Sequence, residues 1–543
     1  MSSWASSLAD PKGGVAPSTT RVSNLANHLT RNARQLGDEP ALIWGDAQWT
    51  WSQMDARVNA LAAGMRDRFG VAKGDRILIQ SQNCNQMFES MLACFRLGAV
   101  WVPANFRQTP EEVAWLAQSS GASGMIWGAE FPDHAAACDT PERNFTLVIG
   151  GTAGDDNDFD TLVQAHMGQT VPNAPVDRDD PCWFFFTSGT TGRPKASVLT
   201  HGQMAFVLLN HLNDLMPGTT HTARSLCLAP LSHGAGVHQM TQVAAGAATV
   251  LFPSGRFDPA VAWKIVQDHK ISNMFTVPTI VKMLVEHESV GQYDTSSLKH
   301  MIYAGAPMYR ADQKYALSVL GKVLVQYFGL GEVTGNITVL PPNEHFEDDD
   351  EMRIGSCGHP RTGIEISIQG NDGTEMPTGQ QGEICVIGPA VFAGYYNNPE
   401  ANTKSFRDGW FRTGDLGYVD EQGYLFITGR ESDMYISGGS NIYPREIEEK
   451  ILTHDDVSET AVLGVPDPVW GEVGIAVCVL RDNAGVSAET LQTWLKPKIS
   501  SYKMPKRFII LDEMPKSAYG KITKKIIRET LEERGLLEQE VTS

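Results

Sequence analysis

The chain has 543 residues, too many for one hydrophobic core, and at about 150 residues per domain it predicts three or four domains. Hydrophobic residues make up 42% of the chain and charged residues 20%, which is ordinary globular usage and excludes the disordered, collagen-like and low-complexity classes. The net charge of −19 argues against general binding to nucleic acid or to an anionic membrane, and no apolar run approaches the roughly 18–20 residues of a membrane span.

The first half of the chain alternates predicted helices and strands. Residues 1–22 are rich in Ser, Gly, Pro and Thr, so we expect a flexible tail without a secretory signal. Residues 22–70 predict two helices, the second starting at Trp51. Short apolar runs predict the strands that follow, at 76–80, 99–103, 184–186, 249–252, 273–277 and 301–303, with a helix at 88–97. This alternation indicates parallel sheets covered on both faces.

The pattern of predicted elements changes at about residue 352. Short strands at 364–368, 382–387 and 423–427 alternate with Gly/Pro turns and predict a small β-rich subdomain. Gly429-Arg430 is the expected boundary, after which a strand at 434–436, a helix at 444–452, further strands and a helix from Ser487 predict a separate α+β domain.

Cysteines and a basic stretch narrow the environment. The eight cysteines are scattered without a Cys-x-x-Cys pair, which favours buried reduced thiols in a cytoplasmic protein over a zinc site or a disulfide framework. Residues 496–528 carry ten Lys or Arg against two acidic residues. Such a run is either a solvated basic face or positive charge placed beside a phosphorylated ligand.

One loop predicts polyphosphate binding. The sequence Thr-Ser-Gly-Thr-Thr-Gly-Arg-Pro-Lys-Ala at 187–196 directly follows a predicted strand. Its glycines let backbone N–H groups approach phosphate oxygens, its hydroxyls donate hydrogen bonds, and its lysine supplies charge. It is not a Walker A loop, because the glycines are three apart and alanine follows the lysine. The residues expected to bind phosphate are Thr187, Ser188, Gly189, Thr190, Thr191, Gly192 and Lys195.

This loop resembles the phosphate loop of the adenylate-forming superfamily, which contains acyl-CoA synthetases, firefly-type luciferases and peptide-synthetase adenylation domains. Further family motifs occur in order, and the resemblance runs from about residue 25 to about residue 530. It implies an α/β fold: an N-terminal adenylation domain at 23–429 with two parallel-type sheets and a small β-barrel-like subdomain at about 352–429, and a mobile α+β C-terminal domain at 430–543.

The resemblance also implies where the substrates bind. Gln326-Tyr-Phe-Gly-Leu-Gly-Glu332 resembles the motif whose glutamate holds Mg²⁺, so Glu332 is the expected metal ligand. Thr413-Gly-Asp415 resembles the ribose-binding turn, with Arg430 reaching the ribose or the phosphate, and Pro515 to Lys521 resembles the terminal motif with the catalytic Lys521. The turn and strand end expected beside adenine comprise Ala304, Gly305, Ala306, Pro307, Tyr327, Phe328 and Gly329.

The acid and the thiol have their own expected sites. Pro230 to Gly236 resembles the family's loop at the acyl pocket, where His233 is expected to act at the carboxylate. Candidate pocket residues, all implied by position in the motifs, are His233, Gly234, Ala235, Ala304, Gly329, Gly331, Thr334 and Gly335. Ser437, Gly438 and Gly439 follow the hinge, expected at Ser432, and would leave room for a pantetheine arm.

Three residues depart from the family pattern. Ala196 replaces a glycine, a change that matters if the residue has a positive φ. Gly331 replaces a threonine, which removes a hydroxyl expected near the α-phosphate and is expected to enlarge the acyl pocket. Ser432 stands where Asp or Lys is usual, so altered kinetics of domain rotation are expected.

These features lead to an expected activity. We expect an AMP-forming carboxylate–CoA ligase that uses ATP, Mg²⁺ and coenzyme A on a medium-chain, branched or aromatic monocarboxylic acid. No candidate pocket residue is Arg or Lys, which disfavours small dicarboxylates. A stand-alone enzyme that loads an acyl carrier protein is the alternative, while a luciferase-like oxidase, a catalytically inactive nucleotide binder and a P-loop ATPase are disfavoured. Dimerisation through the N-terminal region is common in the family, so a homodimer stays open.

Overall fold

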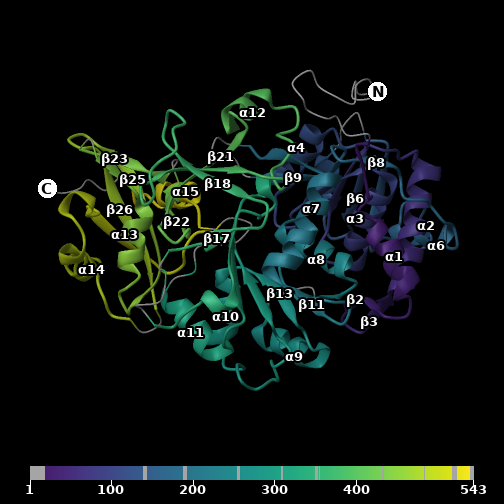
Figure 1. Cartoon of the computed structure of the whole chain (residues 1–543), viewed down its shortest axis with the longest axis horizontal. Coiled ribbons are helices and arrows are strands. Elements are labelled where there is room, and N and C mark those ends of the chain that lie inside the picture. The colour runs from purple at the N-terminus through teal and green to yellow at the C-terminus, as the bar shows by residue number, and fades with distance from the viewer. Residues whose placement is uncertain are drawn as a thin grey trace.

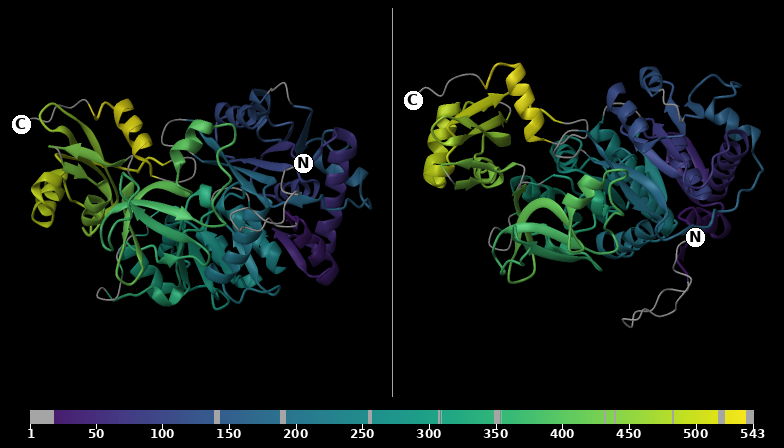
Figure 2. Two further views of the ribbon diagram at one scale, coloured as in Figure 1. Left: turned by 45° about the horizontal axis from the view of Figure 1, so that its top comes forward. Right: turned by 90° about the horizontal axis from the view of Figure 1, so that it is seen from above.

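The computed structural model describes residues 19–138, 143–187, 193–253, 257–306, 308, 310–348, 353, 355–430, 433–438, 440–481, 484–516 and 522–537. Over these residues the strands form four larger sheets and one two-stranded ribbon. The N-terminal helices lie at one end of the molecule and the C-terminal sheet at the other, with the antiparallel strands of residues 365–430 between them (Figures 1 and 2). No helix in the described part of the chain is both long and apolar enough to cross a membrane.

The first large sheet has six strands, with parallel neighbours except for the antiparallel hairpin at one edge. Its strands in spatial order are β10 (Lys195–Thr200), β9 (Pro181–Thr187), β5 (Val100–Ala104), β4 (Arg76–Gln80), β6 (Gly124–Gly128) and β7 (Phe145–Ile149). The hairpin of β9 and β10 encloses residues 188–194, so the expected phosphate loop connects two paired strands.

The second large sheet has nine strands, parallel in its centre and antiparallel at both edges. In spatial order they are β17 (His359–Pro360), β16 (Thr338–Leu340), β15 (Leu324–Phe328), β14 (His300–Tyr303), β13 (Asn273–Thr276), β11 (Arg224–Cys227), β12 (Ala248–Leu251), β2 (Pro40–Trp44) and β3 (Ala47–Thr50). Its central strands are buried on both faces, because side chains alternate between two cores: Met274 lies in one and Phe275 in the other.

Helices cover these sheets. Between the two sheets lie α7 (His201–Asn210), which continues as a π-helical turn (His211–Leu215), and α8 (Gly234–Ala245) (Figure 1). The opposite face of the nine-stranded sheet packs on α9 (Pro259–His269), α10 (Pro278–Glu286) and α11 (Arg310–Leu320). The remaining helices of this half are α1 (Asn27–Gln35), α2 (Trp51–Phe69), α3 (Asn85–Leu97), α4 (Pro110–Ser120), α5 (Pro132–Ala137) and α6 (Phe159–Ala165).

Helix ends follow local chemistry. Thr50, Thr109 and Thr200 each cap a helix. The hydroxyl oxygen of each accepts from the backbone N–H three positions on, and the side chain at that third position accepts from the backbone N–H of the cap. Gly70, Gly98 and Gly121 end α2, α3 and α4 with positive φ, which glycine adopts without strain.

Two smaller sheets follow. The first is antiparallel and contains β18 (Glu365–Gln369), β19 (Gly382–Ile387), β20 (Phe406–Arg407), β21 (Trp410–Val419) and β22 (Leu425–Arg430), with α12 (Pro399–Ser405) beside it. The second contains β23 (Tyr435–Ser437), β24 (Ser440–Ile442), β25 (Val457–Asp467), β26 (Gly471–Leu480) and β27 (Arg507–Leu511), with α13 (Pro444–Ile451), α14 (Ala488–Leu495) and α15 (Lys524–Glu533). The predicted α/β class with several sheets and a distinct C-terminal α+β unit is confirmed.

Three smaller expectations meet the structure here. Residues 1–18 lie outside the described part of the chain, but Arg21 and Val22 are not loose, because they form β1, which pairs with β8 (Val176–Asp177). All eight cysteines are buried and free, as predicted. In the basic stretch, Lys503, Lys516 and Lys524 form ion pairs with glutamates of the same C-terminal unit, which favours a structural over a ligand-binding use of these three charges.

Candidate active site

Glu332 is the centre of a polar cluster at the C-terminal edge of the large sheets. It lies in a 3₁₀ turn (Gly331–Val333) directly after β15 and is 6% exposed. Its Oε1 atom accepts hydrogen bonds from the Thr187 hydroxyl at 2.7 Å and from the Tyr395 hydroxyl at 2.9 Å. No hydrogen bond among the described residues ends on Oε2. We call Glu332, Thr187, Tyr395 and Lys195 the Glu332 cluster.

The segment before α12 fixes the position of Tyr395. Its backbone runs along β10: the N–H of Val198 donates to Gly394, and the N–H of Ala393 donates back to Val198. The N–H of Phe392 donates to the backbone oxygen of Glu332 at 2.7 Å. Burial raises the pKa of Tyr395 far above its ordinary value, so the phenol keeps its proton and donates to the carboxylate. The sequence analysis missed this residue, because a single tyrosine in a loop gives no local signal.

Lys195 approaches the same cluster from β10. Its ammonium lies 5.0 Å from the centre of the Tyr395 ring, a cation–π contact. The next residue, Ala196, is paired with Phe186 in the β9–β10 hairpin and does not have a positive φ. The departure from glycine at this position is therefore benign, as the sequence analysis expects.

Asp415 and Arg430 form a second polar group on neighbouring strands. Asp415 on β21 is the register partner of Arg430 on β22, and its Oδ1 accepts from Arg430 Nε at 2.9 Å. Asp415 Oδ2 is buried, and none of the described residues forms a hydrogen bond with it. Burial raises the pKa of Asp415 and the Arg430 charge opposes this shift, while the Asp415 charge raises the pKa of Arg430. A buried carboxylate oxygen without a donor is a fit for a hydroxyl of a bound ligand.

Glycines bring the candidate acid-binding residues together. A Cβ at Gly234 would lie 2.8 Å from the Phe275 ring and 3.5 Å from the Tyr327 hydroxyl. A Cβ at Gly335, which has a φ of 77°, would lie 2.7 Å from the Tyr327 ring. The Phe275 and Tyr327 rings are 5.9 Å apart. Absence of side chains at 234 and 335 therefore leaves the two aromatic rings as the boundary of this region.

The glycine at 331 does not enlarge the pocket, which corrects the expectation from the sequence. A Cβ at Gly331 would lie 2.7 Å from both Phe185 Cδ1 and Thr187 Cγ2. The space that a threonine would fill is thus occupied by the Phe185 ring. That ring also makes an edge contact with His233, with centroids 5.2 Å apart. Phe185 consequently joins the Glu332 cluster to the candidate acid site.

Among the other candidate pocket residues, Ala235, Ala304 and Thr334 are buried and Gly329 is half-buried. Ala235 lies in the first turn of α8, and Ala304 follows β14. A Cβ at Gly329 would lie 2.3 Å from the Gly335 backbone, so this glycine allows two chain segments to touch. Thr334, at a φ of 54°, accepts from Gln203 Nε2 at 3.2 Å.

The expected adenine-side and thiol-side residues are only partly described. Gly305 and Ala306 are exposed after β14, and Phe328 is half-buried at the end of β15. Ser437 ends β23 and Gly438 follows with a φ of 55°, where a Cβ would lie 2.8 Å from the half-exposed Trp470. No contact between Ser437 or Gly438 and the Glu332 cluster is found in the described ranges. The expected site residues that lie outside those ranges are Ser188, Gly189, Thr190, Thr191, Gly192, Pro307, Ser432, Gly439 and Lys521.

The polar groups fit ATP with Mg²⁺. No three His, Cys, Asp or Glu side chains gather as a metal site in the described part of the chain. Mg²⁺ takes one or two protein carboxylates together with phosphates and water, so a single buried carboxylate such as Glu332 suits it. The unpaired Asp415 Oδ2 would be an acceptor for a ribose hydroxyl.

Comparisons with known proteins agree with this geometry. Residues 29–396 match the family model of the AMP-binding enzymes, and residues 446–521 match that of the AMP-binding enzyme C-terminal domain. A feruloyl-CoA synthase from an Amycolatopsis species is 34% identical over 94% of this chain and 99% of its own length. The fatty acid–[acyl-carrier-protein] ligase ScoC of Streptomyces coeruleorubidus is 31% identical over 94% of this chain and 96% of its own. ATP-bound MatB from Rhodopseudomonas palustris has a TM-score of 0.83 at 28% identity, covering 94% of this chain and 99% of that structure.

Proposed function

The chain belongs to the AMP-binding enzyme family and is an AMP-forming acid–CoA ligase that uses ATP, Mg²⁺ and coenzyme A, and on this premise we propose that its acid is an aromatic monocarboxylate. The observation that carries the proposal is the aromatic boundary of the acid site. Phe185, Phe275 and Tyr327 pack against positions 331, 234 and 335, where a Cβ would overlap their rings, so rigid aromatic surfaces border the candidate acid site. Such surfaces suit a flat ring better than a flexible chain.

The relatives support the same choice. One relative, which matches this chain over nearly its full length, is named a feruloyl-CoA synthase, and the feruloyl group is an aromatic acyl group. Medium-chain and branched acids remain within the wider class that the sequence predicts. A dicarboxylate is disfavoured at the residues of the acid site, because none of the motif-derived candidates is Arg or Lys.

We assign roles at the nucleotide end as follows. Glu332 would hold Mg²⁺, which supplies charge neutralisation at the phosphates. Thr187 and Tyr395 orient the Glu332 carboxylate through their hydroxyls, and the loop at 187–192 with Lys195 would bind phosphate oxygens. Asp415 would accept from ribose, with Arg430 holding its other oxygen.

The chemistry follows in two displacements. An oxygen of the acid attacks the α-phosphorus of ATP and the bond to pyrophosphate breaks, which gives the acyl adenylate. The thiolate sulfur of coenzyme A then attacks the acyl carbon and AMP leaves. Both displacements bring negative charge together, which is why cationic groups at this end lower the barrier.

We also propose that the two steps use two arrangements of the domains. An N-terminal adenylation domain at 23–429, including the β-rich part at 352–429, would act with a C-terminal domain at 430–543 that rotates about Ser432. Lys521 would serve adenylation, and Ser437, Gly438 and Gly439 would line the path of the thiol arm. The location we propose is the cytoplasm, on the chemistry of eight buried free thiols.

A carrier-protein ligase is the second candidate, because ScoC is a relative of similar length. The discriminating experiment supplies ATP, Mg²⁺ and a panel of aromatic, branched and straight-chain acids, with coenzyme A or with a phosphopantetheinylated carrier protein. AMP and acyl-CoA from aromatic acids are the expected products. Acyl transfer to the carrier protein alone would favour the second candidate, and turnover confined to straight-chain acids would overturn the aromatic proposal. Light scattering of the same preparation decides whether a homodimer forms.

A further inference from the structure

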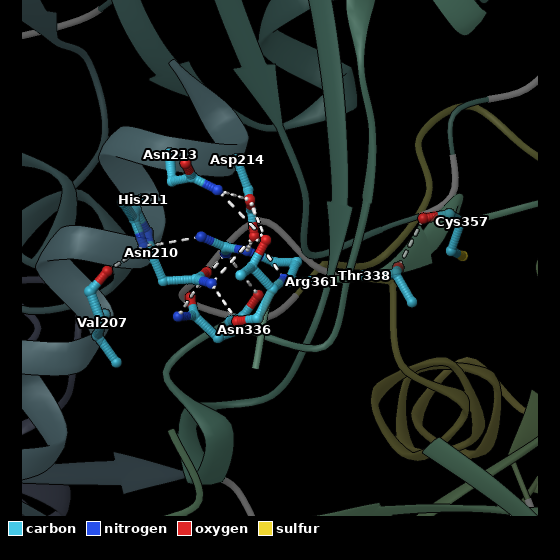
Figure 3. Close-up of polar contacts among 11 residues, drawn as sticks. Val207, Asn210, His211, Asn213, Asp214, Asn336, Thr338, Cys357 and Arg361 are labelled. Atoms are coloured by element: carbon cyan, nitrogen blue, oxygen red, sulfur yellow. Dashed lines mark hydrogen bonds and ion pairs between the residues drawn. The ribbon is translucent and has the colours of Figure 1, made fainter. Parts of the chain in front are cut away.

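A buried arginine lies behind the acid site. Arg361, which follows β17, has a fully buried side chain. Its Nη1 donates to Asn336 Oδ1 at 2.6 Å, and its Nη2 lies 3.2 Å from His211 Nδ1 (Figure 3). Its acidic neighbour is Asp214, with Oδ2 at 3.8 Å from Nε.

Asp214 is more tightly bound by other groups than by this arginine. Its two oxygens accept four hydrogen bonds of 2.6 to 3.0 Å, from the Asn210 and Asn213 amides and from the N–H and hydroxyl of Thr362 (Figure 3). The pair of Arg361 and Asp214 is nevertheless electrically neutral as a unit. The π-helical turn at 211–215 supplies Asp214 and, one turn earlier, His211, and such turns are frequent at functional sites.

Nδ1 of His211 has two partners, and which of them it bonds decides which ring nitrogen carries the proton. A guanidinium can only donate, so Nδ1, at 3.2 Å from Nη2, is the acceptor in that contact, whereas it would have to donate to the Val207 carbonyl at 3.1 Å. Burial lowers the pKa of His211 well below its ordinary value, so the ring is neutral. In the tautomer that accepts from Arg361 the proton sits on Nε2, and in the other tautomer Nδ1 donates to the Val207 carbonyl.

His211 faces the aromatic boundary of the acid site. Its ring centre is 6.4 Å from that of Tyr327, the ring that Gly234 and Gly335 approach. Arg361 also holds the chain at this point, through Asn336 and, at 3.5 Å, the Gly335 carbonyl. His211 thus lies beside Tyr327, one of the rings at the candidate acid site.

We propose that His211 is a specificity-determining residue whose Nε2–H donates a hydrogen bond to a neutral oxygen on the ring of the acid, and that Arg361 is a positioning residue that holds His211 in this tautomer. A hydroxyl, methoxy or carbonyl oxygen fits this donor. A second carboxylate fits poorly, because Asp214 already balances the Arg361 charge. The inference rests on the proposed aromatic-acid ligase activity and adds the class of ring substituent that the site recognises.

The first test compares two acids that differ by one oxygen, cinnamate and 4-hydroxycinnamate. The wild-type enzyme should have the higher kcat/KM for 4-hydroxycinnamate. His211→Phe should reduce that preference about tenfold by raising KM for the hydroxylated acid, since a buried oxygen then loses its partner. His211→Gln, which keeps an N–H donor, should restore part of the preference.

The matched control is His201→Phe, a buried neutral histidine at the other end of α7, which should leave the preference unchanged. An equal loss for both acids in His211→Phe would reduce His211 to a structural role and overturn the proposal. Turnover of cinnamate without any preference in the wild type would also overturn it, while leaving the ligase assignment intact. Failure of both acids to give acyl-CoA would instead contradict the proposed function.

The second test does not depend on turnover. In protein labelled with ¹⁵N-histidine, the His211 signals should show an unprotonated Nδ1 and a protonated Nε2. Arg361→Met should move the proton toward Nδ1, because the Val207 carbonyl at 3.1 Å then becomes its partner, and Arg361→Lys should keep the wild-type pattern. An unchanged tautomer in Arg361→Met would overturn the role of Arg361.

Discussion

The nucleotide end and the acid end of the site are built in different ways. At the nucleotide end, carboxylates lie in or beside short motifs, and each keeps an oxygen that no described protein group binds: Glu332 Oε2 and Asp415 Oδ2. At the proposed acid end, aromatic rings pack directly against glycines, and a buried arginine lies 3.2 Å from a buried histidine. The proposed nucleotide site thus lies in short motifs, while the proposed acid site depends on packing between elements far apart in the chain.

The largest expected effect tests the nucleotide end where the structure does not describe it. Lys521→Ala should reduce adenylate formation by at least about a hundredfold, since it removes a positive charge beside developing negative charge. Thioester formation from supplied acyl adenylate should persist. Pyrophosphate exchange and single-turnover thioester assays measure the two steps separately, and equal damage to both would contradict the two-arrangement proposal.

Glu332→Gln tests the carboxylate inside the described cluster. The amide oxygen can still accept from Thr187 and Tyr395, but the charge that would hold Mg²⁺ is lost, so adenylation should fall about a hundredfold and need more Mg²⁺. Glu344→Gln is the matched control, because Glu344 also accepts from a tyrosine, Tyr424 at 3.0 Å, outside the site. Comparable losses in both variants would remove Glu332 from the metal site.

Asp415→Asn should weaken the binding of ATP and leave the binding of the acid unchanged. A ribose hydroxyl would lose a charged acceptor, so KM for ATP should rise about tenfold while KM for the acid stays within twofold. Steady-state kinetics with each substrate varied in turn measure this. A rise in KM for the acid alone would place Asp415 at the other end of the site.

Gly331→Thr, which introduces the residue usual in the family, tests the junction between the two ends. Its side chain would overlap Phe185 and Thr187, so the free energy of unfolding should fall by about 1–3 kcal/mol. The double variant Phe185→Ala/Gly331→Thr should recover part of this loss, and thermal denaturation of the four proteins in the cycle measures the coupling. Independent, additive effects would show that Phe185 does not occupy the space of the threonine.

The last prediction is a pH dependence that comes from buried imidazoles and does not involve the substrates. Burial lowers the pKa of His238 to about 4 and holds that of His211 well below its ordinary value. Below pH 6.5 the unfolded chain takes up protons that the folded chain does not, so stability should fall as pH decreases from 6.5 toward 4, by up to about 1.4 kcal/mol per pH unit for each such ring. Urea unfolding at several pH values measures the slope. A slope of the opposite sign between pH 6.5 and 5 would show that these rings are charged in the fold.

Sequence reasoning predicts the parts of the fold that depend on local patterns. The strands at 76–80 and 382–387 are found at the predicted residues, and Ser487 caps the helix that is predicted to start there. The edge hairpin of β2 and β3 was not anticipated, because its attachment to β12 joins residues some 200 positions apart. The sequence does not predict Tyr395 and Arg361 for the same reason. Their partners, Glu332 and His211, are distant in sequence and belong to other elements.

The unpartnered oxygen of Asp415 has a consequence for handling the protein. A ligand that supplies the missing donor binds the folded chain and not the unfolded one, so nucleotide raises the stability of the fold by mass action. At a hundredfold excess over its dissociation constant this amounts to about 2.7 kcal/mol. In a cell rich in ATP the enzyme would spend its lifetime in this more durable form, whereas dialysis strips that protection away. The stability of the purified protein in storage therefore depends on the nucleotide in the buffer as well as on the polypeptide.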